Sequence, residues 1–254
     1  MAGSYGAETG RNERYRLSFT VGGLLAPQGR VLASMLVRDA AFAYAAPADA
    51  APADAAPTDA APADNAASAQ DHAASSDDPM RVELGERVLR IRRRAIDSNA
   101  LSIRTQSASA RMVSEVLKRL SALSGEEIRF LADEGTTAND CRALMWVAMC
   151  RYYALIGQFA AEVVRDRYLM GLLSLTREDY DRFIRAKAMW HPELEELTPA
   201  TANKLRANLF KAMVEADLLD ARDNTILPSL LSGTVLSMLD GRSDSMLFFP
   251  MRNA

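Results

Sequence analysis

The chain has 254 residues, of which 49% are hydrophobic and 25% charged, a composition typical of one large globular domain or two small ones. It carries 30 Lys and Arg against 33 Asp and Glu, and the net charge of −3 at face value argues against a nucleic-acid partner. Cys141 and Cys150 have no CxxC spacing and no nearby histidine, which argues against a disulfide framework and against a zinc site. We therefore expect a cytoplasmic protein that binds no metal.

The sequence predicts neither a signal peptide nor a membrane span. Residues 1–16 are polar and have no apolar stretch after a basic one. The most apolar window, 143–164, contains Arg151, and each uncharged side of that arginine is only about half of a ~20-residue span. We expect this window to be a buried core helix.

A repetitive segment interrupts the chain. Residues 45–64 are AAPAD, AAPAD, AAPTD and AAPAD, and a polar stretch follows to residue 79. Regular prolines disfavour a helix, and Ala and Asp offer little to bury, so the sequence predicts a disordered linker over 45–79. The predicted organisation is an N-terminal arm and first helix (1–44), this linker, a helical domain (80–171) and a C-terminal winged-helix-like domain (172–254).

The first half of the chain predicts three helices. One begins at Pro27, and its apolar positions are Val31, Leu32, Met35 and Leu36. A second follows the linker and runs to about Asp97, with an apolar stripe of Leu84, Val88, Ile91 and Ala95. A third has Thr105 as N-cap and ends near 124–125, with a stripe of Val113, Val116, Leu117, Leu120 and Leu123. A short connection over 99–104 makes the last two a helix-turn-helix candidate.

The second half predicts further helices and a short ribbon. One long or two abutting helices cover 139–170, a helix capped by Thr176 runs to about Trp190, and Thr198 with Pro199 opens the next one. That last helix faces inward through Leu205, Leu209, Met213 and Ala216. The apolar runs 226–231 and 246–249 could pair as strands on either side of a small helix over 234–239, compatible with a winged helix. The predicted fold is an all-α, compact helical bundle.

The sequence offers little for catalysis. It contains no GxGxxG, GxxxxGK[ST], GxSxG or HExxH pattern. His72 lies in the linker, and His191 precedes Pro192 at a helix end, where capping or exposure is expected. Acidic pairs such as Glu126 and Glu127 fall near helix starts, where they favour the helix dipole. We expect a non-enzymatic protein with no catalytic residues, no cofactor and no small-molecule substrate.

The informative feature is the charge between Met80 and Arg119, where ten basic residues face four acidic ones. Helical projection puts Arg87, Arg90 and Arg94 opposite the apolar stripe of the first of these helices, and Arg111 and Lys118 on the outer face of the second. Guanidinium groups suit phosphate. The alternative is a merely solvated helical face with pairs such as Glu115 and Arg119. The predicted phosphate contacts are Arg90, Arg93, Arg94, Arg104, Arg111, Lys118 and Arg119.

The helix after Thr198 supplies a second, weaker candidate surface. Lys204, Asn208 and Lys211 share its polar face and could touch phosphates and a base edge, although Glu215 extends the same stripe. Arg206 projects toward the apolar edge and is the alternative case of a structural residue.

Several segments together resemble the BrxA family of bacteriophage exclusion (BREX) defence systems. They are LSFTVGGLLAPQGRVLASML, IDSNALSIRTQSASARMVSEVLKRL, ALIGQFAAEVVRDRY, LTREDYDRF and LTPATANKLRANLFKAMVEADLLD, within residues 17–44 and 80–250. A family Asn-Leu segment matches 99–101, and a Thr-x-x-Lys-Leu-Arg-x-Asn run matches Thr201, Lys204, Leu205, Arg206 and Asn208. The Ala-Pro-Asp repeat departs from the family pattern.

The resemblance implies a small all-helical cytosolic protein with helix-turn-helix elements and a basic surface for double-stranded DNA. Such a protein would work beside the methyltransferase, ATPase and phosphatase-like members of a BREX system. We therefore expect a DNA-binding BREX component whose partners are duplex DNA and other BREX proteins. The rival hypothesis is a protein adaptor whose basic helices dock onto acidic surfaces of those proteins.

The linker changes what the net charge means. Residues 45–79 contain seven aspartates and no Lys or Arg, so the net charge of the other residues is +4 rather than −3. The basic excess is concentrated in 80–119, next to this acidic segment. The linker is therefore also a candidate competitor of DNA for the basic helices.

Overall fold

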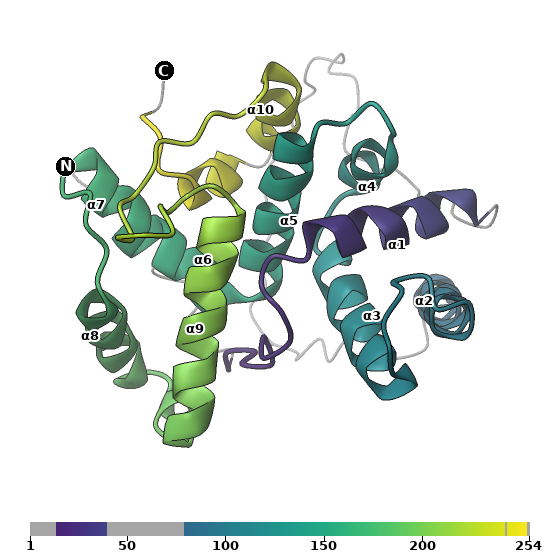
Figure 1. Cartoon of the computed structure of the whole chain (residues 1–254), viewed down its shortest axis with the longest axis horizontal. Helices are drawn as coiled ribbons and strands as arrows, with labels where there is room; N and C mark the ends of the chain where they lie inside the picture. The colour runs from purple at the N-terminus through teal and green to yellow at the C-terminus, as the bar shows by residue number, and fades with distance from the viewer. Residues whose placement is uncertain (1–13, 40–78, 242, 253–254) are drawn as a thin grey trace, which may run out of the picture.

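The computed structural model describes residues 14–39, 79–241 and 243–252. These residues form helices and loops, as Figure 1 shows, so the predicted all-α fold is confirmed. The predicted linker lies outside the described residues except for Pro79, which begins a helix. The α-helices are α1 (Ala26–Arg38), α2 (Pro79–Asp97), α3 (Gln106–Leu120), α4 (Gly125–Ala132), α5 (Ala138–Tyr152), α6 (Ala154–Phe159), α7 (Asp166–Leu169), α8 (Arg177–Ala188), α9 (Pro199–Glu215) and α10 (Gly233–Asp240).

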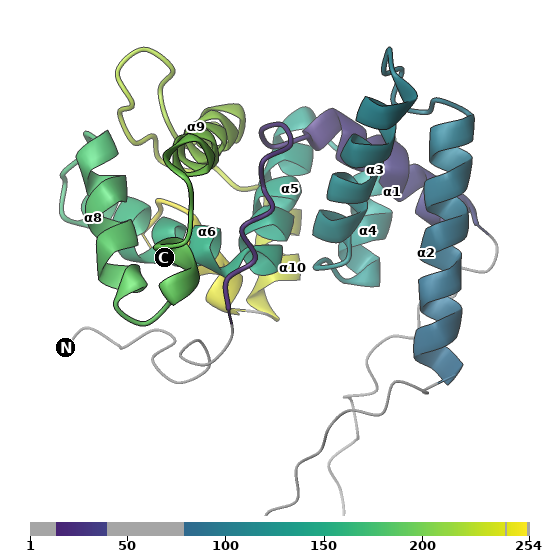
Figure 2. The ribbon, with the colours of Figure 1, turned by 90° about the horizontal axis from the view of Figure 1, so that it is seen from below.

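Helices α1 to α4 pack together at one end of the molecule (Figures 1 and 2). The predicted stripe of α3 is buried, as are Ile91 and Ala95 of α2, whereas Val31, one of the apolar positions of α1, is exposed. Helix α4 was not predicted. Ser124, interpreted as the end of the preceding helix, is the N-cap of α4 and forms a capping box with Glu127.

The centre of the fold is α5, whose residues from Ala143 to Cys150 are all buried. Trp146 donates its indole N–H to the carbonyl of Phe248 at 2.9 Å. Tyr153 ends α5 with extended backbone angles, and α6 then continues through a π-helical turn, Ala160–Arg165, into α7. A Cβ at Gly157 would lie 2.8 Å from the Cys150 carbonyl oxygen, so glycine permits this close approach.

The partly buried Arg151 of α5 is held by a bidentate ion pair. Its Nη1 and Nη2 lie 2.7 and 2.9 Å from the carboxylate oxygens of Glu127, and its Nε donates to Ser245 at 2.9 Å. The partners neutralise the charge that a core helix would otherwise leave unpaired. Within the described ranges, no helix is long and apolar enough to cross a membrane.

The C-terminal part confirms the predicted helices but not the predicted strands. Thr176 and Thr198 cap α8 and α9 as expected, and Gly241 is the C-cap of α10. Residues 246–249 lie in and just after a 3-10 helix, Ser243–Phe248, and Ile226 forms only an isolated bridge with Leu219. The described part of the chain therefore has no two-stranded wing. The run 246–249 ends in the buried Phe248 and Phe249, whereas Leu230 in the run 226–231 is exposed.

An extended segment, residues 14–25, runs between α9 on one side and α3 on the other (Figure 2). We call it the N-terminal strap. Phe19 and Leu24 of the strap are buried, and the N–H of Leu24 donates to Glu215 of α9 at 2.6 Å. Gly23 approaches the same carboxylate so closely that a Cβ would collide with it. The strap therefore connects α9 to the surface of α3.

Candidate nucleic-acid interface

A fixed turn joins α2 to α3. Asn99 has a left-handed φ of 46°, and the N–H of Ala100 donates to the carbonyl of Ala95, the pattern of a helix stop. The Asn99 side-chain oxygen then accepts the N–H of Ile103 at 2.9 Å. Thr105 caps α3 by accepting from Ala108, as the sequence predicts. The connection thus holds the two helices at a defined angle.

Most of the predicted phosphate contacts lie in solvent on this pair of helices. Six of the seven are exposed: Arg90, Arg93, Arg94, Arg104, Arg111 and Lys118. Among the residues whose side chains the structure describes (14–39, 88–241 and 244–252), no Asp or Glu lies within ion-pair distance of any of them. Each side chain therefore keeps an unneutralised charge that an anion could use.

The prediction that Arg119, the seventh residue of the set, contacts DNA is wrong, because this side chain is completely buried. Its Nε donates to Glu115 at 3.0 Å, and its Nη1 donates to the carbonyls of Gly23 and Leu24 at 2.6 and 3.0 Å. The pair with Glu115 exists, but in the interior rather than on a solvated face. Arg119 therefore fixes the strap against α3.

Tyr153 completes this buried cluster. Its hydroxyl donates to the Glu115 carboxylate, at 2.7 and 2.9 Å from the two oxygens. Burial, together with the neighbouring carboxylate, raises the pKa of Tyr153 above its ordinary range, so the phenol stays protonated. The Glu115 charge is thus compensated entirely from within the protein.

One basic residue that the sequence analysis left out belongs to the same surface. Arg92 of α2 lies at the boundary with α3, and its Nε donates to the hydroxyl of Ser114 at 2.8 Å. Ser114 in turn donates to the carbonyl of Ala110 at 2.7 Å. The only indication of this contact in the sequence was Ser114, one helical turn after Arg111. A serine at that position does not show which arginine it contacts.

The second predicted surface, on α9, is partly occupied by contacts within the protein. Lys204 is exposed, whereas Lys211 lies 3.7 Å from Glu215. The amide of Asn208 donates to the carbonyl of Phe19 at 3.0 Å, which holds the strap. Arg206 pairs with Asp181 at 2.8 Å, the structural alternative expected for it. Of the Lys and Arg side chains on this helix, only that of Lys204 is both exposed and without an ion pair to the described residues.

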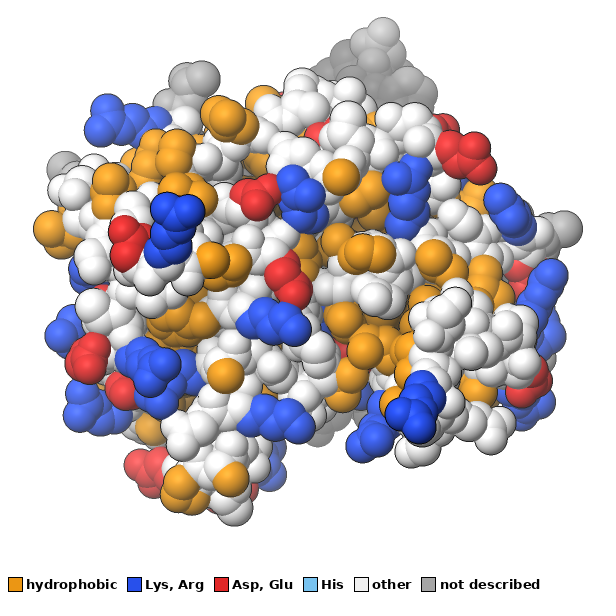
Figure 3. Space-filling view, in the orientation of Figure 1, with side chains coloured by type: hydrophobic (Ala, Val, Ile, Leu, Met, Phe, Trp, Pro, Cys, Tyr) orange, Lys and Arg blue, Asp and Glu red, His pale blue; other side chains and the backbone are white. Residues whose placement is uncertain are grey.

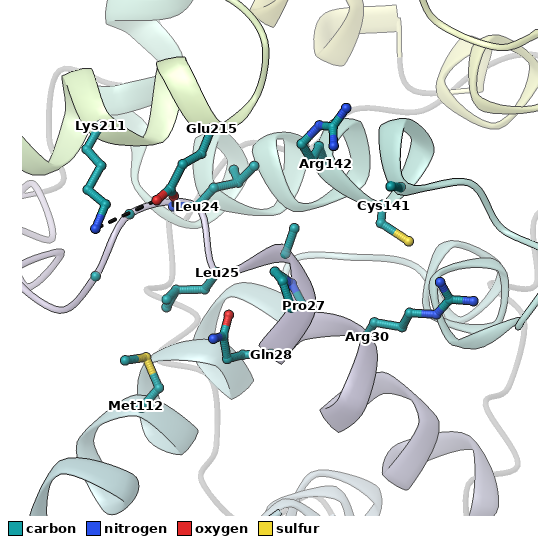
Figure 4. Close-up of a pocket in the computed structure, with 14 residues that line it drawn as sticks. Leu24, Leu25, Pro27, Gln28, Arg30, Met112, Cys141, Arg142, Lys211 and Glu215 are labelled. Atoms are coloured by element: carbon teal, nitrogen blue, oxygen red, sulfur yellow. Dashed lines mark hydrogen bonds and ion pairs between the residues drawn. The ribbon is translucent and has the colours of Figure 1, made fainter. Parts of the chain in front are cut away.

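The strap and a cavity separate the two basic surfaces. On the face shown in Figure 3, Lys and Arg side chains lie over both α9 and α3, with apolar side chains between them. A cavity of about 680 Å³ opens there, and Figure 4 shows Met112 of α3 on one side and Lys211 of α9 on another. Basic side chains of α9 and of α3 thus lie on the same face of the molecule.

The cations that line this cavity are engaged elsewhere. Arg30 donates to the carbonyls of Asp133 and Thr136, and Arg142 pairs with Asp217 at 2.6 Å. Cys141 also lines it, and burial raises the pKa of this thiol, which keeps it protonated. The described residues contain no cluster of three or more His, Cys, Asp or Glu that could hold a metal ion.

His191 takes the N-cap position of a 3-10 helix, Pro192–Leu194, without a capping bond from its side chain, and it is buried rather than exposed. Its ring stacks on Tyr15 with ring centroids 3.8 Å apart, and its Nδ1 lies 3.2 Å from Glu193. Burial alone would raise the pKa of Glu193, but hydrogen bonds from the N–H of Tyr15 and from His191 hold it below its ordinary value. This contact anchors the start of the strap.

Comparisons with known proteins agree with the resemblance noted in the sequence. The family model of BrxA matches residues 82–243. The BREX protein BrxA of Paramagnetospirillum magneticum is 28% identical over 149 residues, 58% of this chain and 74% of that protein. The BREX protein BrxA of Escherichia coli O9:H4 is 25% identical over 125 residues, 49% of this chain and 58% of that protein.

A solved structure extends the likeness to almost the whole chain. It is the crystal structure of an uncharacterized protein from Magnetospirillum magneticum, which matches with a TM-score of 0.60 over 92% of this chain and 97% of that one. At 19% identity this likeness shows a shared fold. Because the family model covers more than half of the residues, the chain belongs to the BrxA family.

Proposed function

We propose that this protein is a non-enzymatic, double-stranded DNA-binding component of a BREX anti-phage defence system. Its relatives are named as BREX proteins, which supports a place among the proteins of such a system. The observation that carries the DNA-binding part is the set of six exposed cations on α2, α3 and their connection, none with an acidic partner in the described chain. Clustered, unpaired arginines bind phosphate strongly and release counterions.

The geometry favours contact with the DNA backbone over base readout. The exposed cations of this surface are five arginines and one lysine, and Asn208, the predicted base contact, already donates to the strap. Contacts to phosphate position a protein without reading sequence. The proposed activity is therefore duplex binding with little sequence preference, with Lys204 of α9 as an outlying contact.

An electrophoretic shift assay with two unrelated duplexes of equal length tests this proposal. We expect both duplexes to bind at 50 mM salt with similar affinity and to dissociate as salt rises to about 200 mM. The protein-adaptor hypothesis predicts that neither duplex binds at 50 mM salt. It would gain support from absence of any shift at 50 mM salt, combined with nuclease-resistant co-purification of other BREX proteins.

Deleting residues 45–78 should tighten duplex binding at low salt. The deleted segment contains seven aspartates and no Lys or Arg, and it directly precedes α2 in the sequence. Its charge opposes DNA at short range, and screening weakens that effect, so the gain should shrink at about 200 mM salt. Fluorescence anisotropy at two salt concentrations measures this difference.

A matched control separates charge from length in that experiment. Replacing the seven aspartates with asparagine keeps the length of the segment and should reproduce the gain in affinity. The melting temperature should be nearly unchanged in both variants. Equal affinity of the deletion variant and the parent at low salt would contradict the competition.

A further inference from the structure

A small hollow lies where α3 meets α2 and the N-terminal strap. Its volume is about 220 Å³. The residues of its lining that matter here are Ser18, Arg92, Arg111, Ser114, Glu115 and Lys118. We call it the α3 hollow. It is distinct from the larger cavity beside α9, with which it shares no lining residue.

Three cations converge on the α3 hollow from two helices. Arg111 and Lys118 lie seven residues apart on α3, which puts them on one face two turns apart. Arg92 enters from α2, and its bond to Ser114 places the guanidinium between them. That bond uses only Nε, and no described residue hydrogen-bonds the two terminal nitrogens of Arg92. The guanidinium is therefore oriented in advance with its forked end available.

The one carboxylate in the lining does not cancel this charge. Glu115 is 3% exposed, and its oxygens already accept from Arg119 and from the Tyr153 hydroxyl. Arg119 compensates its charge on the interior side. Neither Arg111 nor Lys118 is within ion-pair distance of an acidic side chain in the described ranges, so the hollow keeps the field of three cations.

We propose that the α3 hollow seats one phosphate group of a bound nucleic acid, held by Arg92, Arg111 and Lys118. The inference rests on the proposed function and adds to it a defined phosphate site and a contact residue, Arg92, in the α2–α3 interface. Two sources supply this chemistry: a phosphodiester inside the duplex backbone and a phosphomonoester at a 5′ end. A preoriented guanidinium binds either one through paired hydrogen bonds.

Single charge-removing variants test the site. Lys118→Gln and Arg92→Gln are compared with Arg129→Gln, which removes one charge from an exposed position of α4 outside the hollow. Fluorescence anisotropy with a 20-bp duplex gives the slope of log affinity against log salt. Each hollow variant should lose about 0.9 from the magnitude of this slope, and Arg129→Gln should leave it unchanged. Lys118 is exposed, so its replacement does not threaten folding.

Duplexes with and without 5′ phosphates distinguish the two sources. If both duplexes bind equally and Lys118→Gln weakens both to the same extent, the phosphate in the hollow is a backbone phosphodiester. A preference for the phosphorylated duplex that Arg92→Gln and Lys118→Gln remove assigns a terminal phosphomonoester. Wild-type slopes in both variants, with normal melting temperatures, would refute the α3 hollow while leaving DNA binding intact. Failure of the parent protein to bind any duplex would refute the proposed function and the hollow together.

Discussion

Replacing Arg119 with methionine should lower the free energy of unfolding by about 3–5 kcal/mol, because it leaves the Glu115 charge buried without its partner. The substitution also removes the two hydrogen bonds that hold the carbonyls of Gly23 and Leu24. Both losses fall on the junction of α3 with the strap. Urea denaturation followed by circular dichroism measures the change.

Two comparisons make this expectation specific. Lys118→Met changes the neighbouring, exposed position and should stay within about 0.5 kcal/mol of the parent. Glu115→Gln combined with Arg119→Met should recover part of the loss, because no unpaired charge then remains buried. If Arg119→Met cost less than about 1 kcal/mol, the buried pair would not be what fixes the strap.

Reversing three cations together, Arg94→Glu, Arg111→Glu and Lys118→Glu, should weaken duplex binding at 50 mM salt by at least about a hundredfold. The three side chains are exposed and lack acidic partners in the described chain, so the fold does not depend on their charges. Each reversal removes an attraction to phosphate and adds a repulsion. Fluorescence anisotropy measures the affinity.

The control for net charge is a second triple variant. Arg129→Glu, Arg177→Glu and Arg222→Glu make the same change of charge at exposed positions on α4, on α8 and after α9. This variant should retain most of the affinity, since only the location of the charges differs. Similar losses in the two triple variants would mean that total charge, and not the α2–α3 surface, governs binding.

Three of the helices that the sequence predicted correctly, α3, α8 and α9, begin with strong local caps. Thr105, Thr176 and Thr198 each accept a backbone N–H in the first turn, as their positions before apolar periodicity indicate. Helix α4 was missed although Ser124 and Glu127 form a capping box, because the serine also follows the end of α3. Cap residues alone do not show which of two adjacent helices they belong to.

The predicted wing failed for a different reason. A short apolar run such as 246–249 is equally compatible with a strand and with any buried segment. Here Phe248 and Phe249 are buried in and just after a 3-10 helix, and the Phe248 carbonyl accepts from Trp146 of α5. The structure of 246–249 is therefore determined in part by a contact with a residue about 100 positions away in the chain, which the local sequence pattern does not reveal.

The candidate interface shows the same limit. Helical projection placed Arg90 and Arg94 in solvent correctly, because the apolar stripe of α2 determines the opposite face. The predicted contact set was wrong for Arg119, which the strap covers from more than 90 residues away. It also missed Arg92, since a position next to the apolar stripe can face either solvent or a neighbouring helix.

The salt dependence of duplex binding by the full chain tests the central claim most directly. Six exposed cations without acidic partners predict that log affinity falls linearly with log salt, with a slope of about −5 between about 50 and 200 mM. Fluorescence anisotropy with a duplex of arbitrary sequence gives this slope. Absence of binding at 50 mM salt, or an affinity that does not change with salt, would contradict a phosphate-binding surface on α2 and α3.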